Sequence, residues 1–154
     1  MKRTHGSLIV SLAPAMLIAG VWLASTRPVA ASLAASHAPA QNVGSDGSAL
    51  AGVFTADQAT KGQETFQKTC AACHTVAEHT GRKFEERWTG SSVGDLFEFI
   101  SSTMPDGNPG SLEPAEYASV VAYFLKETGY PEGKDELPSE SEPLKKLKIE
   151  PLPH

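Results

Sequence analysis

The clearest periodic pattern of the chain lies between Pro114 and Gly129. Apolar residues recur there at i, i+3, i+4, i+7 and i+8, which is one continuous stripe of an α-helix. The residues of the stripe are Tyr117, Val120, Val121, Phe124 and Leu125. Pro114 suits the first position of a helix, and Gly129 followed by Pro131 ends one. We therefore predict an amphipathic helix from Pro114 to Gly129.

An earlier helix is predicted to begin at Thr55. The run from Thr55 to Gln58 matches a capping box, in which Thr caps the helix and Gln reaches back to it. Ala59, Gly62 and Phe66 then follow at helical spacing. A glycine inside a helix costs about 1 kcal/mol relative to alanine. Close approach by another helix would account for Gly62.

A third helix is predicted from Ser92 to Ser101, with Ser92 as its cap and Asp95 three residues on. Residues 75–91 are predicted to form a loop anchored by Phe84 and Trp88. Prolines and glycines between 101 and 111 exclude a helix or a central strand there.

These patterns predict an all-α protein with one small domain. We expect four segments: a targeting sequence over 1–31, a flexible Ala/Ser/Gly-rich linker over 32–53, the helical domain over 54–137, and a charged, proline-rich tail over 138–154. A helical turn is possible around 144–149. No strand pair, repeat, phosphate loop or Ser-His-Asp arrangement is predicted.

The first segment has the composition of a secretory signal. Lys2 and Arg3 precede an apolar run from Leu8 to Ala24, and small residues lead to a cleavage site predicted after Ala31. The alternative is an uncleaved membrane anchor, although a run of this length is at the short limit for crossing a bilayer. Either alternative exports the rest of the chain, and we expect a periplasmic location.

Removal of this segment would make the chain more acidic. All 18 acidic residues lie after residue 31, and so do 10 of the 13 basic residues, which gives a net charge of −8. This charge argues against binding to nucleic acid or to anionic membrane surfaces. It suits a partner protein with a basic patch, and equally a charge that only maintains solubility.

The sequence CAACH at 70–74 contains both cysteines of the chain, Cys70 and Cys73, followed by His74. A disulfide would close a very short loop, stabilise little and leave His74 unexplained. A dithiol redox centre would sit at the start of a helix after a strand, whereas this pair ends a helix. A zinc site with His79 would take its fourth ligand from His37 or His154. Covalent attachment of one haem c accounts for both thiols and for His74 as an axial iron ligand.

The second axial ligand is predicted to be Met104. It is the only methionine after residue 31, and it lies 30 residues after His74 in the Pro/Gly-rich loop. Pro105 favours an extended conformation at Met104. The alternative is a methionine that fills a gap in the core. A haem iron with His and Met ligands has a raised potential and both axial positions filled, which suits electron transfer.

The chain resembles class I c-type cytochromes over about 51–137. Three blocks carry the resemblance: KGQETFQKTCAACH, RWTGSSVGDLFEFISSTMP and PGSLEPAEYASVVAYFLKETGYPEGKDEL. The last two resemble cytochrome subunits or domains that accept electrons from quinoprotein (PQQ) alcohol dehydrogenases. The resemblance implies a small class I cytochrome c fold, in which crossed N- and C-terminal helices enclose a covalently bound haem. It implies that Gly62 and Phe66 meet Tyr123 and Phe124.

The resemblance also implies two features of the haem surroundings. Arg87 and Trp88 match the region that often holds the haem propionates, and packing in the core is the alternative for Trp88. Class I cytochromes usually carry a proline after the haem motif, whose carbonyl binds the second ring nitrogen of the histidine. No proline lies between His74 and Pro105 here, so another carbonyl, for example near Gly81, must do so. We expect apolar packing on the haem from Phe66, Phe84, Leu96, Ile100 and Phe124.

The predicted function is one-electron transfer without catalysis. A quinoprotein or other dehydrogenase is the expected donor, and an oxidase or another cytochrome the expected acceptor. Two alternatives belong to other classes. A small haem peroxidase would need an open iron position and a distal acid-base residue. A haem-containing docking subunit of a larger redox complex could use the proline-rich tail as a strap.

Overall fold

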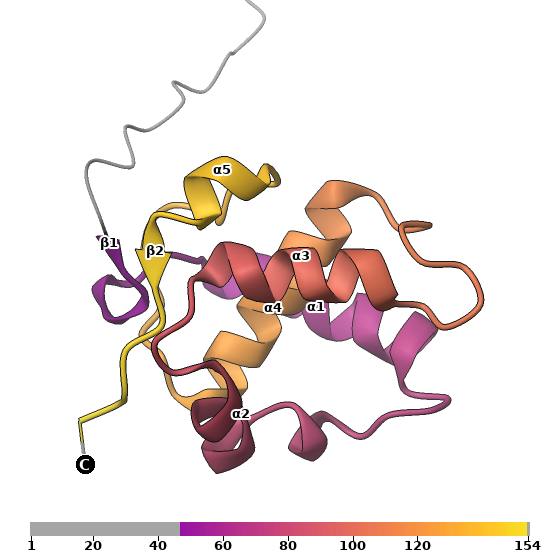
Figure 1. Cartoon of the computed structure of the whole chain (residues 1–154), viewed down its shortest axis with the longest axis horizontal. Helices are drawn as coiled ribbons and strands as arrows, with labels where there is room; N and C mark the ends of the chain where they lie inside the picture. The colour runs from indigo at the N-terminus through magenta and orange to yellow at the C-terminus, as the bar shows by residue number, and fades with distance from the viewer. Residues whose placement is uncertain (1–46, 154) are drawn as a thin grey trace, which may run out of the picture. The chain divides into compact units, whose positions relative to one another are not determined.

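The computed structural model describes residues 47–153. The predicted signal segment, its alternative as an anchor, and residues 32–46 of the predicted linker lie outside the described residues. Within residues 47–153 no helix is both long and apolar enough to cross a membrane. The described part is mostly helical, which confirms the all-α prediction (Figure 1).

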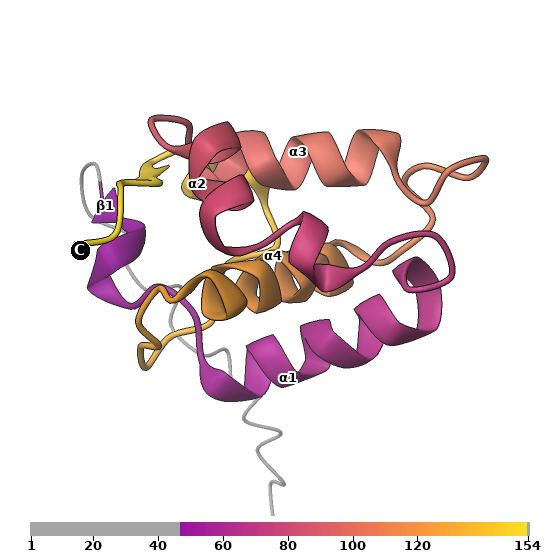
Figure 2. The ribbon, with the colours of Figure 1, turned by 90° about the horizontal axis from the view of Figure 1, so that it is seen from below.

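Two helices, α1 (Ala56–Thr65) and α4 (Pro114–Thr128), pack against each other over most of their length (Figure 2). A Cβ atom at Gly62 would overlap the backbone carbonyl of Ser119 on α4. The predicted reason for this glycine, close approach by another helix, is therefore confirmed. The ring of Phe66 lies 5.9 Å from that of Tyr123 and 5.8 Å from that of Phe124, as the resemblance implied.

Helix α3 (Val93–Thr103) begins at the predicted capping box, with Asp95 N–H donating to Ser92 Oγ and Ser92 N–H donating to Asp95 Oδ2. The prediction of a loop over 75–91 was wrong, because helix α2 spans Gly81–Trp88. Phe84 and Trp88 lie four residues apart and turn toward the interior, so one helical face is apolar while charged residues cover the rest.

The N-terminal cap of α1 also differs in part from the prediction. Gln58 N–H donates to Thr55 Oγ1, so Thr55 does cap the helix. The Gln58 side chain does not reach back. It is buried and forms two hydrogen bonds with the backbone of Leu137, accepting from its N–H at 2.8 Å and donating to its carbonyl at 2.9 Å. The glutamine therefore joins α1 to the segment that follows α4.

The C-terminal segment is part of the domain, which corrects the prediction of a separate tail over 138–154. Helix α5 (Ser141–Leu144) packs on α3, and strand β2 (Leu147–Lys148) pairs in parallel with β1 (Gly47–Ser48). Leu144, Leu147 and Ile149 are buried in the main hydrophobic core. The helical turn suggested for 144–149 is thus a helix that ends at Leu144, followed by a strand.

The N-terminal part of the described chain also has regular secondary structure and contributes to the core. The linker predicted over 32–53 was wrong for residues 47–53, which form β1 and a 3-10 turn, η1 (Ala49–Ala51). Ala49 and the adjoining Phe54 have no exposed surface. A strand pair of two residues leaves no alternating pattern in a sequence, so it was not predicted.

Candidate haem site

The CAACH sequence forms a tight turn at the end of α1. The helix widens into a π turn, η2 (Phe66–Cys70), and the Cys70 carbonyl then accepts hydrogen bonds from Cys73 N–H at 3.1 Å and His74 N–H at 3.0 Å. Both cysteines are free thiols, Cys70 half-buried and Cys73 exposed. Burial raises the pKa of the Cys70 thiol above its ordinary value. The turn thus presents two thiols and an imidazole on one side of the chain.

Met104 lies at the C-terminal end of α3, half-buried and in an extended backbone conformation with φ −127° and ψ 151°. This conformation was predicted from Pro105. The Met104 carbonyl accepts a hydrogen bond of 2.8 Å from the hydroxyl of Tyr117, which is buried on α4. The end of the α3 helix and this hydrogen bond together hold the backbone of Met104.

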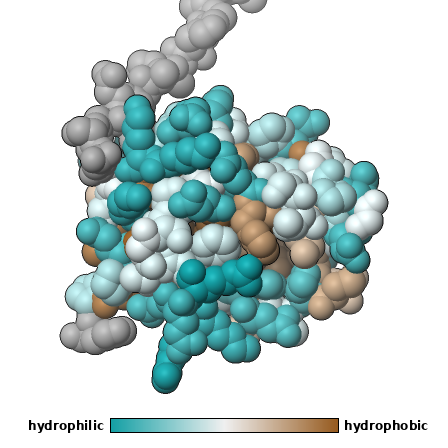
Figure 3. Space-filling model, viewed as in Figure 1, coloured by the Kyte–Doolittle hydropathy of each residue, from teal (hydrophilic) through white to brown (hydrophobic). Residues whose placement is uncertain are grey.

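One cavity of about 350 Å³ brings the predicted site residues together. Its wall includes Cys70, Cys73, His74 and Met104. The five apolar side chains predicted to surround the cofactor also line it: Phe66, Phe84, Leu96, Ile100 and Phe124. Its volume falls within the range of roughly 300–1,000 Å³ that is usual for cofactor and ligand pockets. Figure 3 shows apolar atoms in an opening that polar side chains surround.

Charged side chains line part of the same cavity. Lys83 and Arg87, one turn apart on α2, contribute two positive charges, and Glu78 and Asp106 contribute two negative ones. The Arg87 guanidinium lies over the ring of Phe99 at 4.6 Å and over that of Trp88 at 5.2 Å. Cation–π contacts of this kind hold the guanidinium against the two rings. Basic groups beside an apolar cavity suit a ligand with an apolar body and carboxylate groups.

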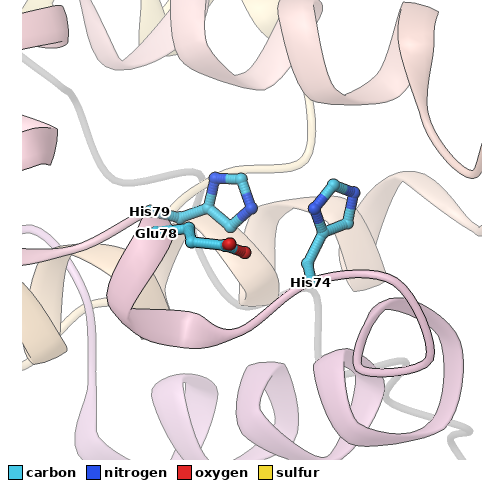
Figure 4. Close-up of side chains that lie close together, drawn as sticks. All are labelled: His74, Glu78 and His79. Atoms are coloured by element: carbon cyan, nitrogen blue, oxygen red, sulfur yellow. The ribbon is translucent and has the colours of Figure 1, made fainter.

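A cluster not predicted from the sequence lies beside His74. Glu78 ends the turn η3 (Val76–Glu78) and His79 follows it. One ligand atom from each of His74, Glu78 and His79 lies within 4.8 Å of the other two (Figure 4). The His79 ring stacks on that of Phe124 at 5.4 Å and meets the His74 ring edge-on at 4.9 Å. A cysteine is not a member of this cluster, which weighs against the zinc site considered from Cys70, Cys73 and His79.

Two pKa values in this cluster depart from their ordinary range. Burial, with the neighbouring His74 as a smaller cause, lowers the pKa of His79, so its ring is favoured in the neutral form. The backbone hydrogen bond from Thr75 lowers the pKa of Glu78, so its carboxylate stays ionised. A Thr-x-x-Glu spacing directly after the haem motif was the available signal for Glu78.

Residues 57–124 match the family model described as Cytochrome C oxidase, cbb3-type, subunit III. The match covers less than half of the chain but contains the CAACH turn, the cavity and Met104. Comparisons with curated proteins and with solved structures gave no match. The family match supports a class I c-type cytochrome. The link to PQQ alcohol dehydrogenases, which the resemblance suggested, has no support from this match.

The matched family implies a covalently bound haem c as the cofactor. The residues present fit this group, because two free thiols lie at the wall of an apolar cavity that also holds a histidine, a methionine and basic side chains. Haem supplies an iron that changes its oxidation state by one electron. The family match therefore supports a haem-based role in electron transfer and implies redox proteins as partners.

Proposed function

We propose that the domain is a one-electron carrier in which Cys70 and Cys73 hold the haem covalently and His74 and Met104 are its axial ligands. The observation that carries the proposal is that all four side chains line the same apolar cavity, although Met104 lies 30 residues from His74. Filled axial positions favour electron exchange over the binding of oxygen or peroxide.

In this proposal the residues of the chain position the two iron ligands, exclude water from the cavity and supply positive charge. The turn at 70–74 fixes the position of the imidazole, and the Tyr117 hydroxyl fixes the backbone of Met104. The phenylalanines and aliphatic side chains of the cavity exclude water, which limits the reorganisation that accompanies a change of charge. Arg87 and Lys83 offer positive charge to the propionates.

An absorption spectrum of the purified haem protein in both redox states tests the ligand assignment. We expect a low-spin spectrum and, in the oxidised form, the weak red band that methionine gives as a ligand of ferric haem. M104A should lose this band and bind added imidazole rapidly, whereas L112A, altered in the same loop, should keep it. A red band that persists in M104A would refute the assignment of Met104.

The same samples distinguish electron transfer from peroxidase chemistry. A carrier should be reduced and reoxidised by small redox mediators and should turn over hydrogen peroxide no faster than free haem does. Rapid peroxide turnover by the unaltered protein would favour the peroxidase alternative.

The proposed location is the periplasm, after cleavage at Ala31. The support is the signal-like composition of residues 1–31 and the attachment of haem c, which agrees with an exported chain. The intact mass of protein from a periplasmic fraction tests this: cleavage predicts a chain that begins at Ser32. A protein that keeps residues 1–31 and sediments with membranes would indicate the anchor instead.

The proposed partners are a dehydrogenase as electron donor and an oxidase or another cytochrome as acceptor. The description of the matched family names a subunit of an oxidase, and this observation favours a second candidate, a haem-containing subunit of a larger redox complex. Size-exclusion chromatography of a mild detergent extract, followed at the haem absorbance, separates the two candidates. A free carrier elutes at the mass of one small domain, and a subunit elutes with its complex.

A further inference from the structure

The ring of His74 needs an acceptor for its second nitrogen, and the usual one is missing. A histidine that binds a metal through one nitrogen donates the N–H of the other to a carboxylate, a backbone carbonyl or water. Between His74 and Pro105 the chain has no proline to expose the carbonyl that serves this purpose in class I cytochromes. The acceptor must therefore come from what the structure places beside the ring.

Glu78 and His79 are the polar side chains of the cluster around His74. Figure 4 shows one ring nitrogen of His74 on the side of Glu78 and His79, and the other on the opposite side. Because one ligand atom of each of the three side chains lies within 4.8 Å of the others, the nitrogen on that side is close to an acceptor, and the other nitrogen points away from Glu78 and His79.

The local sequence holds Glu78 in this place. The turn η3 begins after Thr75, and the Glu78 carboxylate accepts a hydrogen bond of 2.9 Å from Thr75 N–H through Oε2. Thr75 directly follows His74, so this capping bond ties the carboxylate to the backbone next to the ligand. A carboxylate accepts several hydrogen bonds, which leaves capacity for the ring N–H.

We propose that the Glu78 carboxylate accepts the ring N–H of His74 and is the positioning residue of this axial ligand. The proposal rests on the proposed function, because it requires His74 to bind the iron. A direct hydrogen bond needs about 3.0 Å between its heavy atoms. The Glu78 side chain is exposed, so rotation about its side-chain bonds can close the remaining gap without repacking the core.

Glu78 is a better acceptor for this N–H than His79. Hydrogen bonds to an ionised carboxylate are shorter and about twice as strong as neutral ones. The His79 ring is held by stacking on Phe124, so it is less free than the exposed Glu78 side chain to turn toward His74. In this arrangement His79 forms the apolar side of the cluster and limits the rotation of the His74 ring, which it meets edge-on.

A charged acceptor has an electronic consequence that a carbonyl does not share to the same degree. It draws the ring proton toward itself and makes the imidazole a stronger electron donor to the metal. Electron donation stabilises the ferric state relative to the ferrous state. Glu78 should therefore lower the reduction potential of the domain.

The substitution E78Q tests the proposal with little change of shape. The amide oxygen of Gln still accepts the Thr75 N–H, because Gln is tolerated at this position of a capping box. The equilibrium constant for reduction of the haem should rise about tenfold, which is a rise of about 59 mV in the reduction potential of a one-electron couple. In NMR spectra of the reduced protein labelled with ¹⁵N-histidine, the ring N–H proton of His74 should move upfield.

A matched control exists on α4. Glu116 occupies the same capping-box position and accepts a hydrogen bond of 3.0 Å from Glu113 N–H, and it does not line the cavity. E116Q removes the same charge from an equivalent side chain, so it should leave the potential and the His74 signal unchanged. A shift of equal size in E116Q would show a general charge effect and overturn the proposal.

A third variant separates the two candidate acceptors. H79F keeps an aromatic ring that can stack on Phe124 but removes the ring nitrogens. If H79F moves the His74 N–H signal and E78Q does not, the acceptor is His79 and the proposal is wrong. If neither moves it, the acceptor is a backbone carbonyl or water and the proposal is again wrong. Failure of the proposed function would look different, because the unaltered protein would then lack a low-spin histidine-ligated spectrum.

Discussion

The substitution G62A tests whether the contact between α1 and α4 determines the stability of the helical domain. A new Cβ atom at this position would overlap the carbonyl of Ser119 and lie 3.0 Å from the Cβ atom of Tyr123. The obstacle is the backbone of a helix that is buried on several sides, so it cannot move aside as a flexible side chain would. The two helices would have to separate or slide.

The expected loss of stability is the difference of two effects. Overpacking of a well-packed core costs typically 1–3 kcal/mol. Because the obstacle is backbone, we expect the cost of overpacking in G62A to be about 3 kcal/mol. Replacing glycine by alanine inside a helix returns about 1 kcal/mol. The net loss is about 2 kcal/mol, which lowers the melting temperature of a domain of this size by roughly 10 °C.

Thermal unfolding of the haem-loaded protein, followed by far-ultraviolet circular dichroism and by haem absorbance, measures this loss. The matched control is T60A, which changes an exposed position of the same helix and should shift the melting temperature by less than a third as much. Phe66 and Phe124, next to the contact, also line the haem cavity, so both signals should change together. A G62A protein as stable as the unaltered one would refute the packing argument.

Three further predictions test other parts of the domain. Y117F removes the hydrogen bond to the Met104 carbonyl. It should lower the free energy of unfolding, measured by chemical denaturation, by about 1 kcal/mol. The red band that depends on Met104 should also disappear at a lower temperature. I149A removes a side chain with no exposed surface and should cost roughly 2–5 kcal/mol, whereas a loss below about 0.5 kcal/mol would mean that the C-terminal segment does not contribute to the core. Burial, with the charges of Glu85 and Glu150 as smaller causes, raises the pKa of Tyr130 from 10.0 to about 12. The folded state therefore favours the neutral phenol, its stability should fall as the pH rises from about 10 through about 12, and pH titration of the melting temperature should show less of this fall in Y130F.

The three helices predicted from the sequence have strong local signals. Each one combines apolar residues at helical spacing with a recognisable start, such as Ser92 and Asp95 or Pro114. The signal for Gly62 was equally direct, because a glycine inside a helix is costly unless another segment approaches it closely. Local pattern and tertiary packing agree at these positions.

Helix α2 was missed because its pattern is short and mostly charged. Eight residues that contain only Phe84 and Trp88 as large apolar side chains do not fill the window in which periodicity can be recognised. The cluster of Glu78 and His79 beside His74 was also not predicted. Their spacing from His74 is visible in the sequence, but which side chains surround the ring depends on how the chain turns after the haem motif.

The C-terminal segment shows most clearly why sequence patterns were insufficient. Leu144, Leu147 and Ile149 are isolated apolar residues among charges and prolines, and their spacing follows neither a helix nor a strand. Burial in the core depends on partners more than forty residues away, such as α3 and β1. A local pattern does not contain that information, so the segment resembled a solvated tail.

This segment also has a consequence for the site, because it holds the helix that ends at Met104. Gly94, near the start of α3, approaches the backbone of Lys145 so closely that a Cβ atom would lie 2.6 Å from its nitrogen. Lys145 also pairs with Glu98 on α3 at 2.7 Å. The opposite face of α3 contributes Leu96 and Ile100 to the cavity. Because α3 is fixed between the C-terminal segment and the cavity, loosening that segment should shift its C-terminal end. I149A should therefore weaken the methionine-dependent red band before the domain unfolds, although Ile149 does not line the cavity.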